Sequence, residues 1–128
     1  MLDIALPTGL ASVSTARRLV REIVATSANP ELADDAALLT SEVVTNALLH
    51  GRSPVRIAVS VGMGVRIEVS DCGPRDLVVR EHGALATSGR GLTLLDLLAR
   101  WGVVQTDTGK AVWFELGETR ARPGGAAT

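Results

Sequence analysis

The stretch that decides the fold is residues 39–51, which read LTSEVVTNALLHG. In a helix of about 100° per residue, Asp35, Glu42 and Asn46 fall in one stripe about 40° wide. Apolar residues border this stripe, with Leu38 and Leu49 on one side and Leu39 and Val43 on the other. Because an unpaired buried polar group costs roughly 1–3 kcal/mol, these side chains need partners. The stripe is therefore either a helix edge whose polar groups are satisfied within the protein, or part of a ligand site.

The helix that carries the stripe is expected from about Glu31 to His50, with acidic residues in its first turn and Gly51 at its end. His50 is best interpreted as a helix-end residue, because a cation suits that terminus. Before it, apolar residues spaced by three and four predict an amphipathic helix from Ala11 to about Ser27. The spacing of Leu92, Leu95 and Leu98 predicts a third helix that continues to Trp101 and Gly102.

Strands are predicted where apolar and other residues alternate. Residues 2–6 form a short edge strand, 55–61 and 65–69 a hairpin, and 103–105 and 111–116 a last hairpin. Residues 74–91 keep no period and are expected to form a loop. We therefore predict an α/β (α+β) two-layer sandwich, in which a mixed, mostly antiparallel sheet is covered on one face by about three helices. Residues 1–117 are expected to form a single domain, and residues 118–128 a disordered tail.

Composition narrows the classes of function. The 128 residues are 46% hydrophobic and carry a formal net charge of −1, which suits one globular domain and argues against nucleic-acid binding. Cys72 is the single cysteine, so an intrachain disulfide and a multi-cysteine metal site are excluded. No apolar run approaches the ~20 residues that span a bilayer, and the N-terminal residues lack the basic start of a leader. We expect a cytoplasmic protein that binds no membrane.

A second candidate feature is residues 69–74, which read VSDCGP. Asp71 follows an alternating strand, so its carboxylate is expected at the end of the sheet, where it could accept a hydrogen bond from an exocyclic amine. Gly73 would let the backbone approach a ligand closely. The same residues also suit an ordinary turn.

A third candidate feature is residues 88–92, SGRGL, at the start of the third predicted helix. Glycines and a helix N-terminus favour anions such as phosphate, and Arg90 can add a charge-assisted contact. The pattern is neither a Walker A loop nor a Rossmann fingerprint. A flexible helix cap is the simpler alternative.

Together, in this chain order, the three features resemble the GHKL (histidine-kinase-like) ATPase fold, and specifically its anti-sigma factor serine/threonine kinase branch. Residues 39–51 are similar to the N box of that fold, residues 69–74 to its G1 box, and residues 88–102 to its G2 box. Residues 109–114, GKAVWF, resemble the last strand motif. The order and spacing agree over about residues 8 to 116.

The resemblance implies ATP and Mg²⁺ as ligands and assigns a role to each matching residue. Glu42 would be the catalytic base, and Asn46 would hold the Mg²⁺ that bridges the phosphates. Asp71 would accept the adenine amine, and Gly73 would let adenine approach. The nucleotide-binding lid would consist of Ser88, Gly89, Arg90, Gly91 and Leu92, which would fold over the triphosphate.

Two positions depart from the family pattern. Thr87 stands where kinases of this branch often have an arginine, and Lys110 stands where the last strand commonly has a threonine near adenine. The family's roles are therefore not transferred to these two residues.

The leading hypothesis is a kinase that transfers the γ-phosphate of ATP to a small antagonist (anti-anti-sigma) protein, binds a sigma factor and so regulates transcription. The resemblance also implies a homodimer. The alternative is a non-catalytic, ATP-dependent protein-binding module. A catalytic domain that acts with a separate phosphoacceptor, or a domain of this shape without nucleotide, also stays open. Glu42 separates the first two hypotheses, because a binding module has no use for a carboxylate beside the phosphates.

Overall fold

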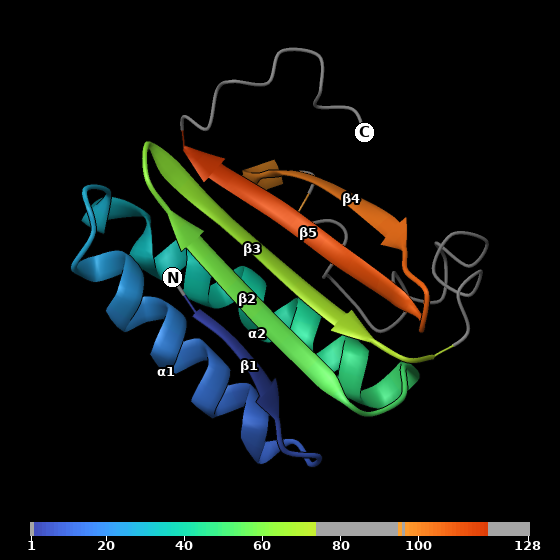
Figure 1. Ribbon diagram of the computed structural model, residues 1–128. Helices are drawn as coiled ribbons and strands as arrows, with labels where there is room; N and C mark the ends of the chain where they lie inside the picture. Colours follow the sequence, from blue (N-terminus) through green and yellow to red (C-terminus); the bar gives the residue numbers. More distant parts are fainter. Residues whose placement is uncertain (1, 74–94, 96, 118–128) are drawn as a thin grey trace.

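Alternating apolar residues form the two central strands of the sheet. In the computed structural model, which describes residues 2–73, 95 and 97–117, β2 (Val55–Val61) and β3 (Gly64–Asp71) form the predicted hairpin. Val61 lies opposite Val65 and Ile57 opposite Val69, so the apolar residues of both strands share one face. The buried face of this hairpin is the surface on which the helices pack (Figure 1).

Five antiparallel strands make up the sheet, in the order β1-β2-β3-β5-β4. β1 (Leu2–Leu6) pairs with β2 at one edge, as predicted, and β4 (Arg100–Gln105) forms the other edge. β5 (Lys110–Gly117) lies between β3 and β4 and pairs with both. The prediction of a mixed sheet was too broad, since every pairing between the described strands is antiparallel. The β2–β3 and β4–β5 connections are hairpins, whereas β3 and β4 run in the same direction with β5 between them.

Two helices cover one face of this sheet, which confirms the predicted two-layer α+β architecture (Figure 1). α1 spans Ala11–Ala25, and α2 spans Ala33–His50 after a 3-10 turn, η1, at Pro30–Leu32. The helix expected from Glu31 thus begins as the 3-10 turn η1. Pro30 suits the first position of this turn because it has no N–H to leave unpaired. None of the described helices combines the length and the apolar character needed to cross a membrane.

α1 ends two residues earlier than predicted. The Ser27 hydroxyl donates to the Val24 carbonyl (2.6 Å) and accepts from the Asn29 amide (3.0 Å), so it binds groups that a continuing helix would use. Such local bonds from serine compete with helical ones.

The predicted third helix is shorter at its C-terminal end than the sequence indicated. Leu95, Leu97 and Leu98 are helical, and the Ala99 amide still donates to the Leu95 carbonyl. Arg100 and Trp101, which were expected in this helix, instead begin β4. Pairing with β5 outweighs the helical spacing, because Arg100 lies opposite Glu115 and binds its carboxylate. The start of this helix, the loop at residues 74–91 and the tail at residues 118–128 lie outside the described residues, so those predictions stay predictions.

The core lies between the sheet and the helices. Its largest fully buried side chain is Phe114 on β5, which joins Ile57 and Ile67 of the central strands, Leu39 of α2 and Leu95. Aliphatic residues supply the rest, as expected for a chain with three aromatic residues.

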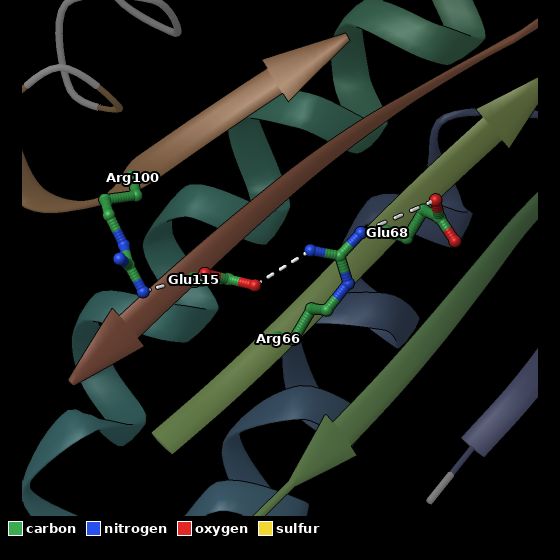
Figure 2. A network of polar contacts seen from close by, with 4 residues as sticks. All are labelled: Arg66, Glu68, Arg100 and Glu115. Atoms are coloured by element: carbon green, nitrogen blue, oxygen red, sulfur yellow. Dashed lines mark hydrogen bonds and ion pairs between the residues drawn. The ribbon is translucent and has the colours of Figure 1, made fainter. Parts of the chain in front are cut away.

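A charged cluster occupies the opposite face of the sheet (Figure 2). Glu115 alternates with Phe114 along β5, so its side chain lies on the face away from the helices. Its carboxylate is only 4% exposed and accepts hydrogen bonds from Arg66 (2.9 Å) and Arg100 (3.0 Å), one at each oxygen. The Arg66 guanidinium also lies 4.7 Å from the centre of the Trp113 ring. The cluster links β3, β5 and β4 across the outer face.

We predict that Phe114→Ala lowers the free energy of unfolding by about 3–5 kcal/mol, because a fully buried ring is replaced by a cavity. Met63→Ala is the matched control: Met63 is 68% exposed, so this change is expected to stay within about 0.5 kcal/mol of the wild type. Urea denaturation followed by circular dichroism measures both values. Equal losses for the two variants would contradict the position of the core.

Candidate functional site

Asp71 ends β3 and lies in the interior of the protein. Its side chain is 4% exposed and lies on the face of the sheet that carries Ile67 and Val69, toward the helices. The oxygen Oδ1 accepts a hydrogen bond from the Gly73 amide (2.7 Å) and another from Nζ of Lys110 (2.8 Å). Lys110 lies directly opposite Asp71 in the pairing of β3 with β5. The carboxylate is therefore at the end of the sheet, as predicted, but it is buried and paired with a cation.

Three glycines allow the chain to close around Asp71. A Cβ atom at Gly51 would lie 2.4 Å from the Asp71 carboxyl carbon, and one at Gly109 would lie 2.0 Å from its backbone oxygen. At Gly73 an added Cβ would come within 2.9 Å of Cα of Gly51. These three residues, called here the glycine cluster, bring the ends of α2, β3 and the β4–β5 turn together at Asp71: Gly51 and Gly73 lie against its carboxylate and Gly109 against its backbone. A bond from the Cys72 amide to the Arg52 carbonyl (2.8 Å) joins the same segments.

The polar stripe of α2 lies at the boundary between the buried and the exposed faces of that helix. Asp35, Glu42 and Asn46 are all half-buried. Leu39 and Val43 are buried on one side, as expected, but Leu38 and Leu49 are 42% and 55% exposed on the other. The expectation that apolar side chains enclose the stripe on both sides was therefore wrong for these two leucines.

Glu42 makes no hydrogen bond or ion pair with the described part of the chain. A half-buried carboxylate without a partner keeps its oxygens available to a ligand or a reacting hydroxyl. Asn46 follows it by one turn of the same helix.

The axis of α2 sets the spacing of the site. The helix ends at His50, and the Gly51 amide still donates to the Ala47 carbonyl (2.9 Å). At 1.5 Å per residue, Asn46 lies about 7.5 Å and Glu42 about 13.5 Å along the axis from Gly51. Gly51 lies close to Asp71 of β3, so Asp71, Asn46 and Glu42 follow one another in the direction of the α2 axis. An elongated ligand that ran from Asp71 along α2 would reach Glu42.

The residues predicted to form the nucleotide-binding lid lie outside the described residues; they are Ser88, Gly89, Arg90, Gly91 and Leu92. Thr87, which precedes them, also lies outside. His50 is the exposed last residue of α2, in agreement with its interpretation as a helix-end residue. Within residues 2–73, 95 and 97–117, no group of three or more His, Cys, Asp and Glu side chains could hold a metal ion.

Two parts of this arrangement were not found by sequence reasoning. Gly51 was interpreted only as a helix end and Gly109 only as part of the last strand motif, although both lie against Asp71. Lys110 was noted as a departure from a family pattern, but its pairing with Asp71 was not predicted. The register of β3 with β5 decides that pairing, and the alternating patterns of two separate hairpins do not contain it.

Comparison with known proteins defines the class of this domain. The family model of the histidine kinase-like ATPase domain matches residues 6–116, so the chain belongs to that family. Among solved structures, the blue-light activated histidine kinase of Erythrobacter litoralis EL346 is similar, with 24% sequence identity and a TM-score of 0.47. That match covers 88% of this chain and 45% of the kinase, so the chain spans less than half of its length. No curated protein matches the sequence.

Membership of this family makes the protein an ATP-binding domain of the GHKL type, and the described residues fit a nucleotide. The oxygen Oδ2 of Asp71 receives no hydrogen bond from the described residues, so an acceptor is available beside the glycine cluster. Gly51 and Gly73 place no side chain of their own against that carboxylate. Mg²⁺ commonly uses one or two protein ligands together with substrate phosphates, so a site without a metal cluster of its own is compatible with it.

We predict that Gly51→Ala destabilises the fold by about 1–3 kcal/mol, because the new methyl group would overlap the Asp71 carboxylate. Gly62→Ala is the matched control, since an added Cβ at Gly62 meets nothing within 4 Å. Thermal unfolding of both variants tests this. A Gly51→Ala protein as stable as the Gly62→Ala protein would show that the contact with Asp71 is not as close as described.

Proposed function

We propose that this domain is a serine/threonine protein kinase of the anti-sigma type, which transfers the γ-phosphate of ATP to a small antagonist protein. The observation that carries the proposal is Glu42, a half-buried carboxylate without a partner among the described residues, one helical turn from Asn46. A domain that only bound ATP would gain nothing from an unpaired carboxylate there.

Each residue has a distinct task in this proposal. Asp71 binds the adenine amine at the buried end of the site, and Asn46 helps to hold Mg²⁺, which would neutralise phosphate charge. Glu42 orients the attacking serine or threonine hydroxyl and accepts its proton as the oxygen bonds to the γ-phosphorus, while the bond from that phosphorus to the bridging oxygen breaks and ADP leaves. Phosphoryl transfer depends mainly on such positioning and on charge stabilisation, and the lid at residues 88–92 would contribute to the latter.

The biological role follows from the same proposal. Phosphorylation of the antagonist would change whether this protein binds the antagonist or a sigma factor, so partner switching would regulate transcription in the cytoplasm. A homodimer is part of the proposal. It rests on the resemblance of the sequence to the anti-sigma branch and not on any contact described above.

We predict that Glu42→Ala abolishes phosphoryl transfer while the affinity for Mg-ATP stays within a few-fold of the wild type. Asn46→Ala and Asp71→Asn are expected to lower the affinity itself, because they remove groups that hold the nucleotide. Isothermal titration calorimetry measures binding, and incubation with labelled Mg-ATP and candidate small antagonist proteins from the same genome measures transfer.

Asp35→Ala is the control for these variants, since Asp35 lies on the same stripe of α2 but further from Asp71 than Glu42. It is expected to leave both binding and transfer unchanged. Transfer that survives in Glu42→Ala would refute the role of Glu42 as base. Tight ATP binding by the wild type without transfer to any candidate would favour the non-catalytic binding module.

A further inference from the structure

Lys110 is the single lysine of the chain, and it is buried. Lys110 as a whole is 3% exposed, and its Nζ lies 2.8 Å from Oδ1 of Asp71. A lysine ammonium has three N–H donors. The described residues provide one acceptor, so the other donors receive no acceptor from them.

The second buried carboxylate of the protein shows what a satisfied arrangement looks like. Each oxygen of Glu115 accepts a bond from a different arginine, Arg66 at one and Arg100 at the other (Figure 2). Asp71 differs, because both of its bonds are to Oδ1, from Gly73 and Lys110. Glu115 is thus bonded through both oxygens, whereas the Asp71–Lys110 pair keeps an acceptor, Oδ2, next to spare donors at Nζ.

Folding alone does not account for this pair. A buried ion pair seldom adds net stability unless further hydrogen bonds satisfy the remaining donors and acceptors. Here Oδ2 of Asp71 and Nζ of Lys110 are close together, and Gly51 and Gly73 place no side chain of their own against the carboxylate. Oδ2 of Asp71 can accept a hydrogen bond and Nζ of Lys110 can donate one. The pair is therefore complementary to the edge of a heterocycle that carries a donor next to an acceptor.

We propose that Lys110 determines the base specificity of the nucleotide site, with Nζ donating to N1 of adenine while Oδ2 of Asp71 accepts a hydrogen from the 6-amino group. This inference rests on ATP binding at Asp71 and is independent of phosphoryl transfer. Guanine in the same position presents an acceptor at O6 to Asp71 and a donor at N1 to Lys110, so both contacts become repulsive. With Lys110, the site therefore recognises two neighbouring groups of the base, the 6-amino group and N1.

The wild-type protein provides the first test, without any substitution. Affinities for Mg-ATP, for 1-deaza-ATP, which has C–H in place of N1, and for GTP are measured by isothermal titration calorimetry. Because 1-deaza-ATP cannot accept the hydrogen bond from the charged Nζ of Lys110, it is expected to bind about 10-fold to 100-fold more weakly than ATP. GTP is expected to bind more weakly still, because buried polar groups would be left unpaired.

A spectroscopic test uses the fact that the chain has one lysine. Labelling of lysine with ¹⁵N at Nζ gives a single side-chain signal for the protein. ATP is expected to shift this signal strongly, and 1-deaza-ATP to shift it much less, because only ATP offers an acceptor at N1.

Lys110→Met removes the donor, and Gln105→Met is its matched control. Gln105 lies opposite Lys110 in the pairing of β4 with β5 and is exposed. Lys110→Met is expected to weaken ATP binding about 10-fold or more and to bring the ratio of ATP to 1-deaza-ATP affinity close to one. Gln105→Met is expected to keep the wild-type ratio. If Lys110→Met does not fold, the wild-type affinities and the labelled signal still decide.

The outcomes separate this inference from the proposed function. Equal wild-type affinity for ATP and 1-deaza-ATP overturns the role of Lys110 while ATP binding stands. Tighter ATP binding by Lys110→Met also overturns it, because the lysine would then obstruct the base. If the wild type binds neither ATP nor GTP, the proposed function and this inference both fail. A loss of transfer in Glu42→Ala has no bearing on it.

Discussion

The arrangement depends on one close contact, that of the Asp71 carboxylate with the backbone at Gly51. No larger residue fits at position 51, since an added Cβ would lie 2.4 Å from the carboxyl carbon of Asp71. The contact brings the C-terminal end of α2 to the end of β3, and the glycine cluster extends it to the β4–β5 turn. Because α2 also carries Asn46 and Glu42, one contact sets where the whole polar stripe lies relative to the sheet. Close packing of this kind tolerates little change in volume.

The two faces of the sheet use buried carboxylates in different ways. On the outer face, Glu115 accepts from Arg66 and Arg100 and links three strands, which makes it a structural residue. On the face toward the helices, Asp71 pairs with Lys110 through one oxygen only. The first carboxylate is bonded at both oxygens, whereas Oδ2 of the second receives no hydrogen bond from the described residues. In the function proposed above, the nucleotide binds to this second oxygen.

Prediction from sequence succeeded where the signal is local. The hairpin of β2 and β3 follows from alternating apolar residues on both sides of Gly62, and α2 ends at His50, just before the predicted Gly51. It failed where two local preferences compete, as at Arg100 and Trp101, which keep helical spacing but pair with β5. It also failed for Leu38 and Leu49, whose exposure depends on which parts of the fold pack against α2 and not on their neighbours in the chain.

The sequence by itself determined the residue types of the site, the elements that carry them and the family to which the domain belongs. Periodicity and short motifs are properties of neighbouring residues, so they can be read without coordinates. Only the tertiary structure decided that Lys110 pairs with Asp71, that three glycines pack against Asp71 and that Glu42 has no partner among the described residues. These facts depend on strand register and on contacts between distant segments; Asp71 and Lys110 are 39 positions apart. A shift of one residue between β3 and β5 would place Lys110 on the other face of the sheet, and no local pattern excludes that shift.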